Sequence, residues 1–287
     1  MSVYEKNLEK NKANFVPLTP LTFLVRAKEI YPNYEAVIYE DRNYTWSEVY
    51  KRCVKFASAL SKIGIKKGDT VSFLAFNTPE IFEAHYSVPM TGAVLNTINI
   101  RLDAKTISYI LEHGEAKVLV VDRQLHVEVK KALSTIKRKI TIIDINDKHA
   151  DQSKCEKIGN REYEEFLKTG DENFQWKMPE DEWQALSLSY TSGTTGNPKG
   201  VLYSHRSTMI HTLAAANPDA LNISSTDVIM PIAPMFHANA WGIPYIANMV
   251  GAKLVLPGRH LDGEHVYDIL QKEKVTFTAA VPTIWLM

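Results

Sequence analysis

Short runs of β-branched residues alternate with amphipathic segments from about residue 35 onward, and few folds accommodate such an alternation. The pattern is typical of a sheet flanked by helices, so the sequence predicts an α/β protein. The expected strands span residues 71–76, 118–121, 185–190, 201–204, 254–256 and 276–281. The expected helices span residues 45–63, 79–86, 206–216, 241–250 and 262–274.

Local capping signals mark where two of these helices begin. Thr45 and Glu48 are spaced as in a capping box, in which each side chain satisfies a free backbone N–H group of the other residue. Gly64 is placed to form the left-handed cap at the end of the same helix. Thr78 and Pro79 offer an N-cap followed by proline at the first helical position.

Periodicity also predicts which parts of the chain are buried. In the helix over residues 206–216, Met209, Ile210 and Leu213 are expected to point inward. The run over residues 146–160 is polar, lacks either periodicity and is expected to be a surface connection. Its charges are of mixed sign and are not interleaved with aromatic residues, which argues against a nucleic-acid or partner site there.

The composition is that of a globular protein. The chain has 287 residues, of which 45% are hydrophobic and 23% charged, so disorder is not expected. Lys plus Arg and Asp plus Glu both number 33, which gives zero formal charge. A neutral chain has no general attraction to nucleic acid or anionic lipid, so any anion that it binds must be held by local geometry.

The compartment expected from the sequence is a reducing cytoplasm. The opening segment alternates charged and apolar residues and lacks the apolar core of a secretory signal. Apolar stretches such as residues 241–250 are too short to cross a bilayer, so no membrane span is expected. The two cysteines, Cys53 and Cys155, have no CxxC or Cys/His spacing, and Cys53 is predicted to be a buried thiol.

Residues 190–200, with the sequence YTSGTTGNPKG, carry the strongest chemical signal. Serine and threonine hydroxyls and glycine backbone N–H groups are compact donors that close around phosphate oxygens, because nothing bulky keeps the backbone away. Lys199 adds a positive charge that can reach a phosphate or anchor the loop. The segment is therefore interpreted as a phosphate-binding loop between two strands.

Two other interpretations of this loop fit the residues less well. A Ser/Thr/Gly-rich linker has no need for a strand on each side or for a Pro-Lys-Gly ending. A P-loop requires Gly-Lys-Ser/Thr followed by a helix, whereas here Gly196 is followed by Asn-Pro-Lys-Gly and then by an expected strand.

The loop resembles the signature loop of the adenylate-forming superfamily, which includes acyl-CoA synthetases, peptide-synthetase adenylation domains and luciferases. The flanking Glu182-Trp183 and residues 201–206 also look familial, and weaker similarity extends over most of the chain. The family's loop binds the β- and γ-phosphates of ATP–Mg. The resemblance assigns that role to Thr191, Ser192, Gly193, Thr194, Thr195, Gly196, Asn197, Pro198 and Lys199, with Thr191 as a contact of Mg²⁺.

The resemblance also implies a fold and a reaction. The fold would be the N-terminal large domain of these enzymes, with mixed sheets flanked by helices and without the small C-terminal domain. Within residues 1–287, a first subdomain portion would cover about 15–175, and a second portion with the loop about 176–287. In the reaction, a carboxylate attacks the α-phosphate of ATP and releases pyrophosphate, and the thiolate of CoA then displaces AMP.

A second segment, residues 234–242 with the sequence PMFHANAWG, resembles the family's acyl-pocket motif. The resemblance places His237 beside substrate and nucleotide, and Trp241 on the same cavity. A lone histidine beside apolar residues, or a tryptophan on a helix, is more often structural, so this interpretation depends on the phosphate loop.

The residue after Phe236 bears on the acid that is activated. Amino-acid-activating relatives usually carry an Asp there, which pairs with the α-ammonium group, whereas this chain has His237. An unpaired ammonium in an apolar pocket costs several kcal/mol, so the substrate is expected to be an acid without an α-amino group. Residues 234–285 resemble medium-chain fatty acyl-CoA synthetases and methylmercaptopropionate-CoA ligases, and the choice between these stays open.

The family's later motifs, including its catalytic lysine, have no counterpart here, and the ending looks cut rather than finished. The full-length parent is expected to be an acyl-CoA ligase that uses ATP, Mg²⁺ and CoA on a small carboxylic acid, with a homodimer as one option. The 287-residue chain alone is expected to be inactive. An aryl-acid or luciferase-like enzyme, or a nucleotide-binding fragment without catalysis, remains as an alternative.

Overall fold

The computed structural model describes residues 2–191 and 196–285. Its strands are β1 (Glu35–Tyr39), β2 (Arg42–Thr45), β3 (Thr70–Leu74), β4 (Val94–Thr97), β5 (Ala116–Asp122), β6 (Thr141–Ile145), β7 (Arg161–Glu162), β8 (Ala185–Tyr190), β9 (Gly200–Ser204), β10 (Val228–Pro231), β11 (Lys253–Val255) and β12 (Phe277–Ala279). The helices are α1 (Leu21–Ile30), α2 (Trp46–Lys62), α3 (Pro79–Ser87), α4 (Ala104–His113), α5 (His126–Leu133), α6 (Tyr163–Lys168), α7 (His205–Ala215), α8 (Ala238–Trp241), α9 (Ile243–Val250), α10 (Gly263–Lys272) and α11 (Pro282–Trp285). Short 3₁₀ helices are η1 (Val3–Glu5), η2 (Pro89–Thr91), η3 (Arg123–Leu125) and η4 (Gln152–Lys154).

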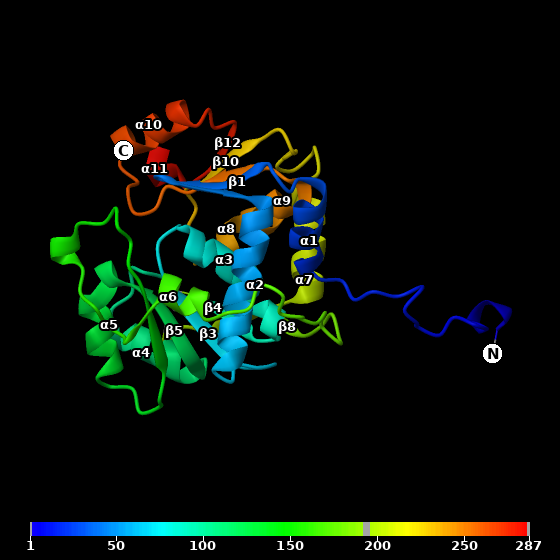
Figure 1. Ribbon diagram of the computed structural model, residues 1–287, viewed down its shortest axis with the longest axis horizontal. Coiled ribbons are helices and arrows are strands. Elements are labelled where there is room, and N and C mark those ends of the chain that lie inside the picture. Colours follow the sequence, from blue (N-terminus) through cyan, green and yellow to red (C-terminus); the bar gives the residue numbers. More distant parts are fainter. Residues whose placement is uncertain (1, 192–195, 286–287) are drawn as a thin grey trace.

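Two mixed sheets form the framework, as Figure 1 shows. The larger has the order β7-β6-β5-β3-β4-β8-β9, and the smaller has the order β12-β10-β11-β1-β2. Neighbouring strands are parallel except in two hairpins, β8–β9 in the larger sheet and β1–β2 in the smaller. The predicted α/β class with mixed sheets is confirmed.

Helices cover both faces of each sheet. The largest apolar cluster joins α1, α2, α3 and α9 to both sheets, so these helices form a central layer. A second cluster packs α4 and α5 on the other face of the larger sheet, and a third packs α10 on the outer face of the smaller sheet. The long helix α2 runs between the two sheets in Figure 1.

The start of α2 follows the predicted capping box. The backbone N–H of Glu48 donates to the Thr45 hydroxyl (3.3 Å), and the backbone N–H of Thr45 donates to the Glu48 carboxylate (2.7 Å). Cys53 is fully buried on the inner face, as predicted, and Gly64 follows the helix with φ +89°. Local sequence and tertiary packing therefore favour the same helix at the same place.

Helix α3 carries charges into the core, which apolar periodicity did not reveal. Glu80 and Glu83 are almost fully buried. The guanidinium of Arg42 contacts the Glu80 carboxylate at 2.5 Å, and that of Arg52 contacts the Glu83 carboxylate at 2.5 Å. Because a buried carboxylate without a partner is costly, these two pairs are what allows α3 to lie between the sheets.

The smaller sheet draws strands from both ends of the chain, whereas the larger sheet is built from one continuous stretch. The smaller sheet combines β1 and β2 with β10, β11 and β12, and the larger combines β3 to β7 with β8 and β9. The predicted division near residue 175 falls between β7 and β8, and it stays a prediction. The segment over residues 146–160 is less superficial than expected, because Asp147 is buried and accepts a hydrogen bond from the Tyr39 hydroxyl (2.5 Å).

Two sequence predictions about helices were wrong. The buried face of α7 carries His205, Thr208 and Thr212, whereas Ile210 and Leu213 are nearly half exposed; only Met209 packs against the core as expected. The helix expected over residues 241–250 begins only at Ile243. Among the described residues, no helix has both the length and the apolar character needed to span a membrane.

Candidate functional site

The predicted phosphate loop connects the two strands of a hairpin. Tyr190 of β8 pairs with Gly200 of β9, and the backbone N–H of Thr191 donates to the carbonyl of Lys199 (3.0 Å). The loop therefore leaves and re-enters the sheet at one edge, as the sequence predicted for a loop between two strands.

The described loop residues present their side chains to solvent. Thr191, Asn197 and Lys199 are exposed, and Pro198 is half-buried. Gly196 is also exposed, and its φ of +148° favours glycine over any other residue. Ser192, Gly193, Thr194 and Thr195 lie outside the described residues.

Tyr190 anchors the base of the loop. Its hydroxyl forms a 2.7 Å hydrogen bond with Nδ1 of His113 on α4, and the two rings pack edge to face. Burial, and secondarily the neighbouring Tyr109, raise the pKa of Tyr190 to about 12, so the phenol keeps its proton at neutral pH. This contact joins two segments 77 residues apart, and periodicity gave no signal for it.

Asn77 fixes the approach to the second segment. Its side-chain amide donates to the carbonyls of Pro231 (2.7 Å) and Ala233 (3.1 Å), and its side-chain oxygen accepts from the backbone N–H of Met235 (2.8 Å). All three bonds are buried, so one side chain satisfies both carbonyl and N–H groups of the backbone that follows β10. Sequence reasoning missed this residue.

The segment with His237 and Trp241 contains a left-handed turn. Residues 238–241 have φ values of 43°, 48°, 48° and 56°, and Gly242 follows at 82°. Each L-residue in this conformation costs roughly 1–2 kcal/mol, so surrounding contacts must hold the turn. The amide of Asn239 donates to the Ser187 hydroxyl (3.1 Å), and Nε2 of His211 donates to the Trp241 carbonyl (3.1 Å).

The turn displays the two predicted pocket residues at the surface. His237 is exposed, and Trp241 keeps 40% of its area exposed. Asn239 and Ala240, between them, are buried. Ser187, the partner of Asn239, lies on β8 three residues before Tyr190, so both predicted segments adjoin the same strand.

A buried histidine lies on α3 in the central layer. His85 is fully buried, its Nδ1 donates to the Ile81 carbonyl (2.8 Å), and burial lowers its pKa to about 4. It is therefore neutral at pH 7. Among the described residues, neither Nε2 of His85 nor the side-chain oxygen of Asn239 has a hydrogen-bond partner.

A cavity of about 400 Å³ lies between the β1–β2 hairpin and α6, and no described residue of the predicted site lines it. Several of its charged groups pair with one another, as in Arg42–Glu80 (2.5 Å) and His149–Asp41 (2.7 Å). Volume alone does not make it the better candidate, because the chemistry-bearing segments adjoin β8 instead.

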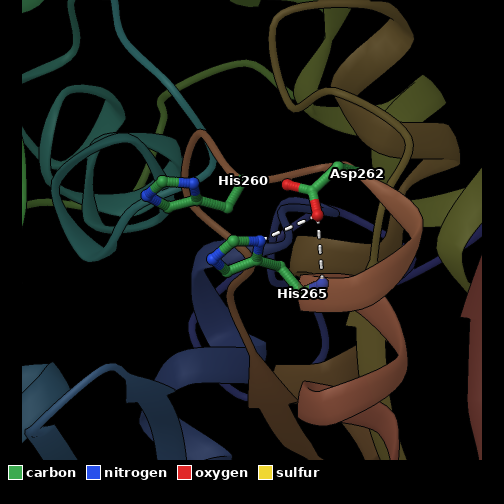
Figure 2. A group of neighbouring side chains, drawn as sticks. All are labelled: His260, Asp262 and His265. Atoms are coloured by element: carbon green, nitrogen blue, oxygen red, sulfur yellow. Dashed lines mark hydrogen bonds and ion pairs between the residues drawn. The ribbon is translucent and has the colours of Figure 1, made fainter.

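One further group concerns metal binding. Within the described part of the chain, His260, Asp262 and His265 are the three side chains placed to share a metal ion (Figure 2). They lie between β11 and the first turn of α10. This His-rich set does not suit Mg²⁺, which prefers oxygen ligands, whereas the hydroxyl of Thr191 offers an oxygen of the kind that Mg²⁺ accepts beside phosphates.

Comparison with known proteins gives the family. The sequence profile described as AMP-binding enzyme matches residues 24–287, and the chain belongs to this family. A peroxisomal acetate/butyrate–CoA ligase of Arabidopsis thaliana is 40% identical over 97% of this chain and 50% of its own length. A medium-chain-fatty-acid–CoA ligase of Ectopseudomonas oleovorans is 44% identical over 84% of this chain and 44% of its own. The chain thus spans about half the length of these relatives.

Solved structures agree on the fold. An anthranilate CoA ligase in complex with anthranoyl-AMP superposes with a TM-score of 0.83 at 23% identity, over 96% of this chain and 52% of that one. A long-chain-fatty-acid–CoA ligase from Archaeoglobus fulgidus gives 0.81 at 24% identity, over 94% and 53%. The two sheets and their central helices are therefore the N-terminal architecture of the adenylate-forming fold.

Proposed function

We propose that the protein carrying this chain is an AMP-forming acid–thiol ligase, which activates a carboxylic acid with ATP and transfers the acyl group to CoA. The observation that carries the proposal is the Gly/Ser/Thr/Lys loop closed by Thr191 and Lys199 at the end of the β8–β9 hairpin. Membership in the AMP-binding family supports it.

The loop's part in this reaction is to hold the triphosphate. The loop's hydroxyl and backbone N–H groups would surround the β- and γ-phosphates, and Lys199, which is exposed, would offset their charge. Mg²⁺, bound through phosphate oxygens and the Thr191 hydroxyl, would supply further charge neutralisation. Orientation of bound reactants is worth about 7–11 kcal/mol in well-aligned systems, which is the effect a fixed loop provides.

The acid is proposed to lack an α-amino group. His237 follows Phe236 where an ammonium-pairing Asp would be needed, and Trp241 offers an exposed ring beside it. Relatives named for acetate/butyrate, medium-chain fatty acids and trans-cinnamate support an organic acid of this kind. A straight- or thio-substituted medium-chain acid is the specific proposal, with an aryl acid as the alternative.

The test uses the full-length protein with ATP, Mg²⁺ and CoA. Octanoate and methylthiopropionate should give thioester, AMP and pyrophosphate, and Lys199→Ala should raise the KM for ATP while Lys139→Ala, at another exposed lysine, leaves it unchanged. Pyrophosphate exchange that is faster with amino acids than with octanoate would overturn the proposal.

A second variant tests the pocket. Trp241→Ala removes a large ring from the surface of the turn, so it should change the preference among acyl chain lengths more than the KM for ATP. Equal losses for every acid and for ATP would instead assign Trp241 to the fold.

Three further points belong to the same proposal. The 287-residue chain alone should not turn over, because it spans about half the length of its relatives; CoA-dependent AMP formation within tenfold of the full-length protein would contradict this. A cytoplasmic location and a homodimer are proposed as well, and fractionation and light scattering test them.

A further inference from the structure

His260, Asp262 and His265 converge at the start of α10. Asp262 is the N-cap, and its Oδ1 accepts from the backbone N–H of His265 (3.2 Å) and from Nδ1 of the same residue (2.8 Å). The ring of His260 stacks on that of His265 with centroids 4.6 Å apart. Figure 2 shows Asp262 joined to His265 by the two hydrogen bonds, with His260 beside them, and one ligand atom of each residue lies within 4.8 Å of the others.

Helix capping does not account for the whole group. Both hydrogen bonds to Asp262 use Oδ1, and no hydrogen bond of the described residues ends on Oδ2. His260 adds nothing to the cap, yet its ring lies against His265.

We propose that His260, Asp262 and His265 form a binding site for a borderline divalent metal such as Zn²⁺. Two imidazoles and a carboxylate are the donor set that selects Zn²⁺ and its neighbours over Mg²⁺ or Ca²⁺. Ligands around tetrahedral Zn²⁺ lie roughly 3.4 Å apart, given bonds of about 2.0–2.1 Å, so small rotations of three exposed or half-buried side chains close the site. Water completes the tetrahedron, and the bound ion ties the loop before α10 to the helix.

Arg259 opposes this site. Its Nε donates to Nε2 of His260 (3.0 Å), and its Nη1 donates to the side-chain oxygen of Gln124 (2.9 Å). Arginine stays charged, so it both occupies a ring nitrogen of His260 and repels an approaching cation. Arg259→Gln should therefore tighten metal binding, whereas a purely structural cluster would gain nothing from it.

The experiment is calorimetric titration of the full-length protein, prepared without a polyhistidine tag, with ZnCl₂ and separately with MgCl₂. Loss of a group that only orients a ligand costs about 10- to 100-fold in metal affinity, so His260→Ala and His265→Ala should each weaken Zn²⁺ binding at least that much. His149→Ala is the matched control, because His149 pairs with Asp41 at 2.7 Å in another exposed His–carboxylate pair.

Support requires one Zn²⁺ per chain, the two losses, an unchanged His149→Ala and a gain with Arg259→Gln. Replacing Zn²⁺ by Co²⁺ should then give a visible absorption band that His265→Ala abolishes. Zn²⁺ affinity that is the same in His260→Ala and His265→Ala as in the unmodified protein overturns the proposal. So does MgCl₂ binding to the group as tightly as ZnCl₂.

Discussion

Gly242 ends the left-handed turn that presents Trp241, and replacing it by alanine should destabilise the fold in two ways. Its φ of +82° costs an L-residue about 1–2 kcal/mol. In addition, a Cβ there would lie 2.9 Å from Cδ2 and 3.0 Å from Nε2 of His211, so the ring must move. That movement weakens the 3.1 Å bond to the Trp241 carbonyl, and a hydrogen bond of this kind contributes about 0.5–1.5 kcal/mol.

The expected loss in unfolding free energy is therefore about 1.5–3.5 kcal/mol, measured by urea denaturation followed by circular dichroism. Gly64→Ala is the matched control, because Gly64 has φ +89° but a Cβ added there would meet nothing within 4 Å. It carries the backbone cost alone, and the change in unfolded-state entropy is the same in both variants. The difference between the two variants isolates the contact with His211.

A double-mutant cycle with His211→Ala sharpens the test. Once the ring is removed, Gly242→Ala should cost no more than Gly64→Ala, which gives a coupling of about 1 kcal/mol between positions 242 and 211. If Gly242→Ala costs the same with and without the ring, the turn is not held by His211.

Three further predictions concern stability and association. Burial raises the pKa of Asp122 to about 7, so the folded state binds a proton that the unfolded state has lost, and stability falls as pH rises toward 7. Asp122→Asn should therefore stabilise the protein at pH 8 by about 1.4 kcal/mol for each pH unit between the folded and unfolded pKa values. The same variant should have little effect at pH 4, and urea denaturation at both pH values measures the difference. Thr45→Ala removes the cap of α2 and should lower the urea midpoint by the equivalent of about 1 kcal/mol, and an unchanged midpoint would contradict the capping role. Leu202 is 63% exposed on the edge strand β9 and should promote self-association of residues 1–287. Leu202→Lys should therefore lower the average molecular mass measured by light scattering, whereas Val127→Lys, at another exposed site on α5, should leave it unchanged.

The sequence correctly predicted those elements whose ends are set by interactions between residues close together in the chain. The capping box at Thr45 and the glycine after α2 act within a few residues, so no tertiary information was needed. Helix α7 keeps the helical period, but its inner face lies one residue earlier than expected, at Thr208, Met209 and Thr212. Thr212 is buried with its hydroxyl bonded to the Thr208 carbonyl (2.7 Å), so a polar side chain faces the core without losing its hydrogen bond, while Leu213 faces out.

The candidate site also has one part that the sequence could predict and one that it could not. The loop could be found because the glycine, hydroxyl and lysine groups that would bind phosphate are adjacent in the sequence. The left-handed turn could not, because Asn239 and Trp241 reach that conformation through contacts with Ser187 and His211, which lie 52 and 30 residues away in sequence. Asn77 was missed for the same reason, since its three partners lie more than 150 residues along the chain.

The interleaved sheets also set an order of events during synthesis. Val37 of β1 pairs with Leu254 of β11, 217 residues later, so the smaller sheet cannot close until the ribosome has passed that point. At about 5–20 residues per second, the β1–β2 hairpin waits on the order of 10–40 s with its apolar residues uncovered. A chaperone that binds exposed apolar segments should therefore be able to bind the nascent hairpin during that interval, and slower translation before residue 254 should lengthen its exposure.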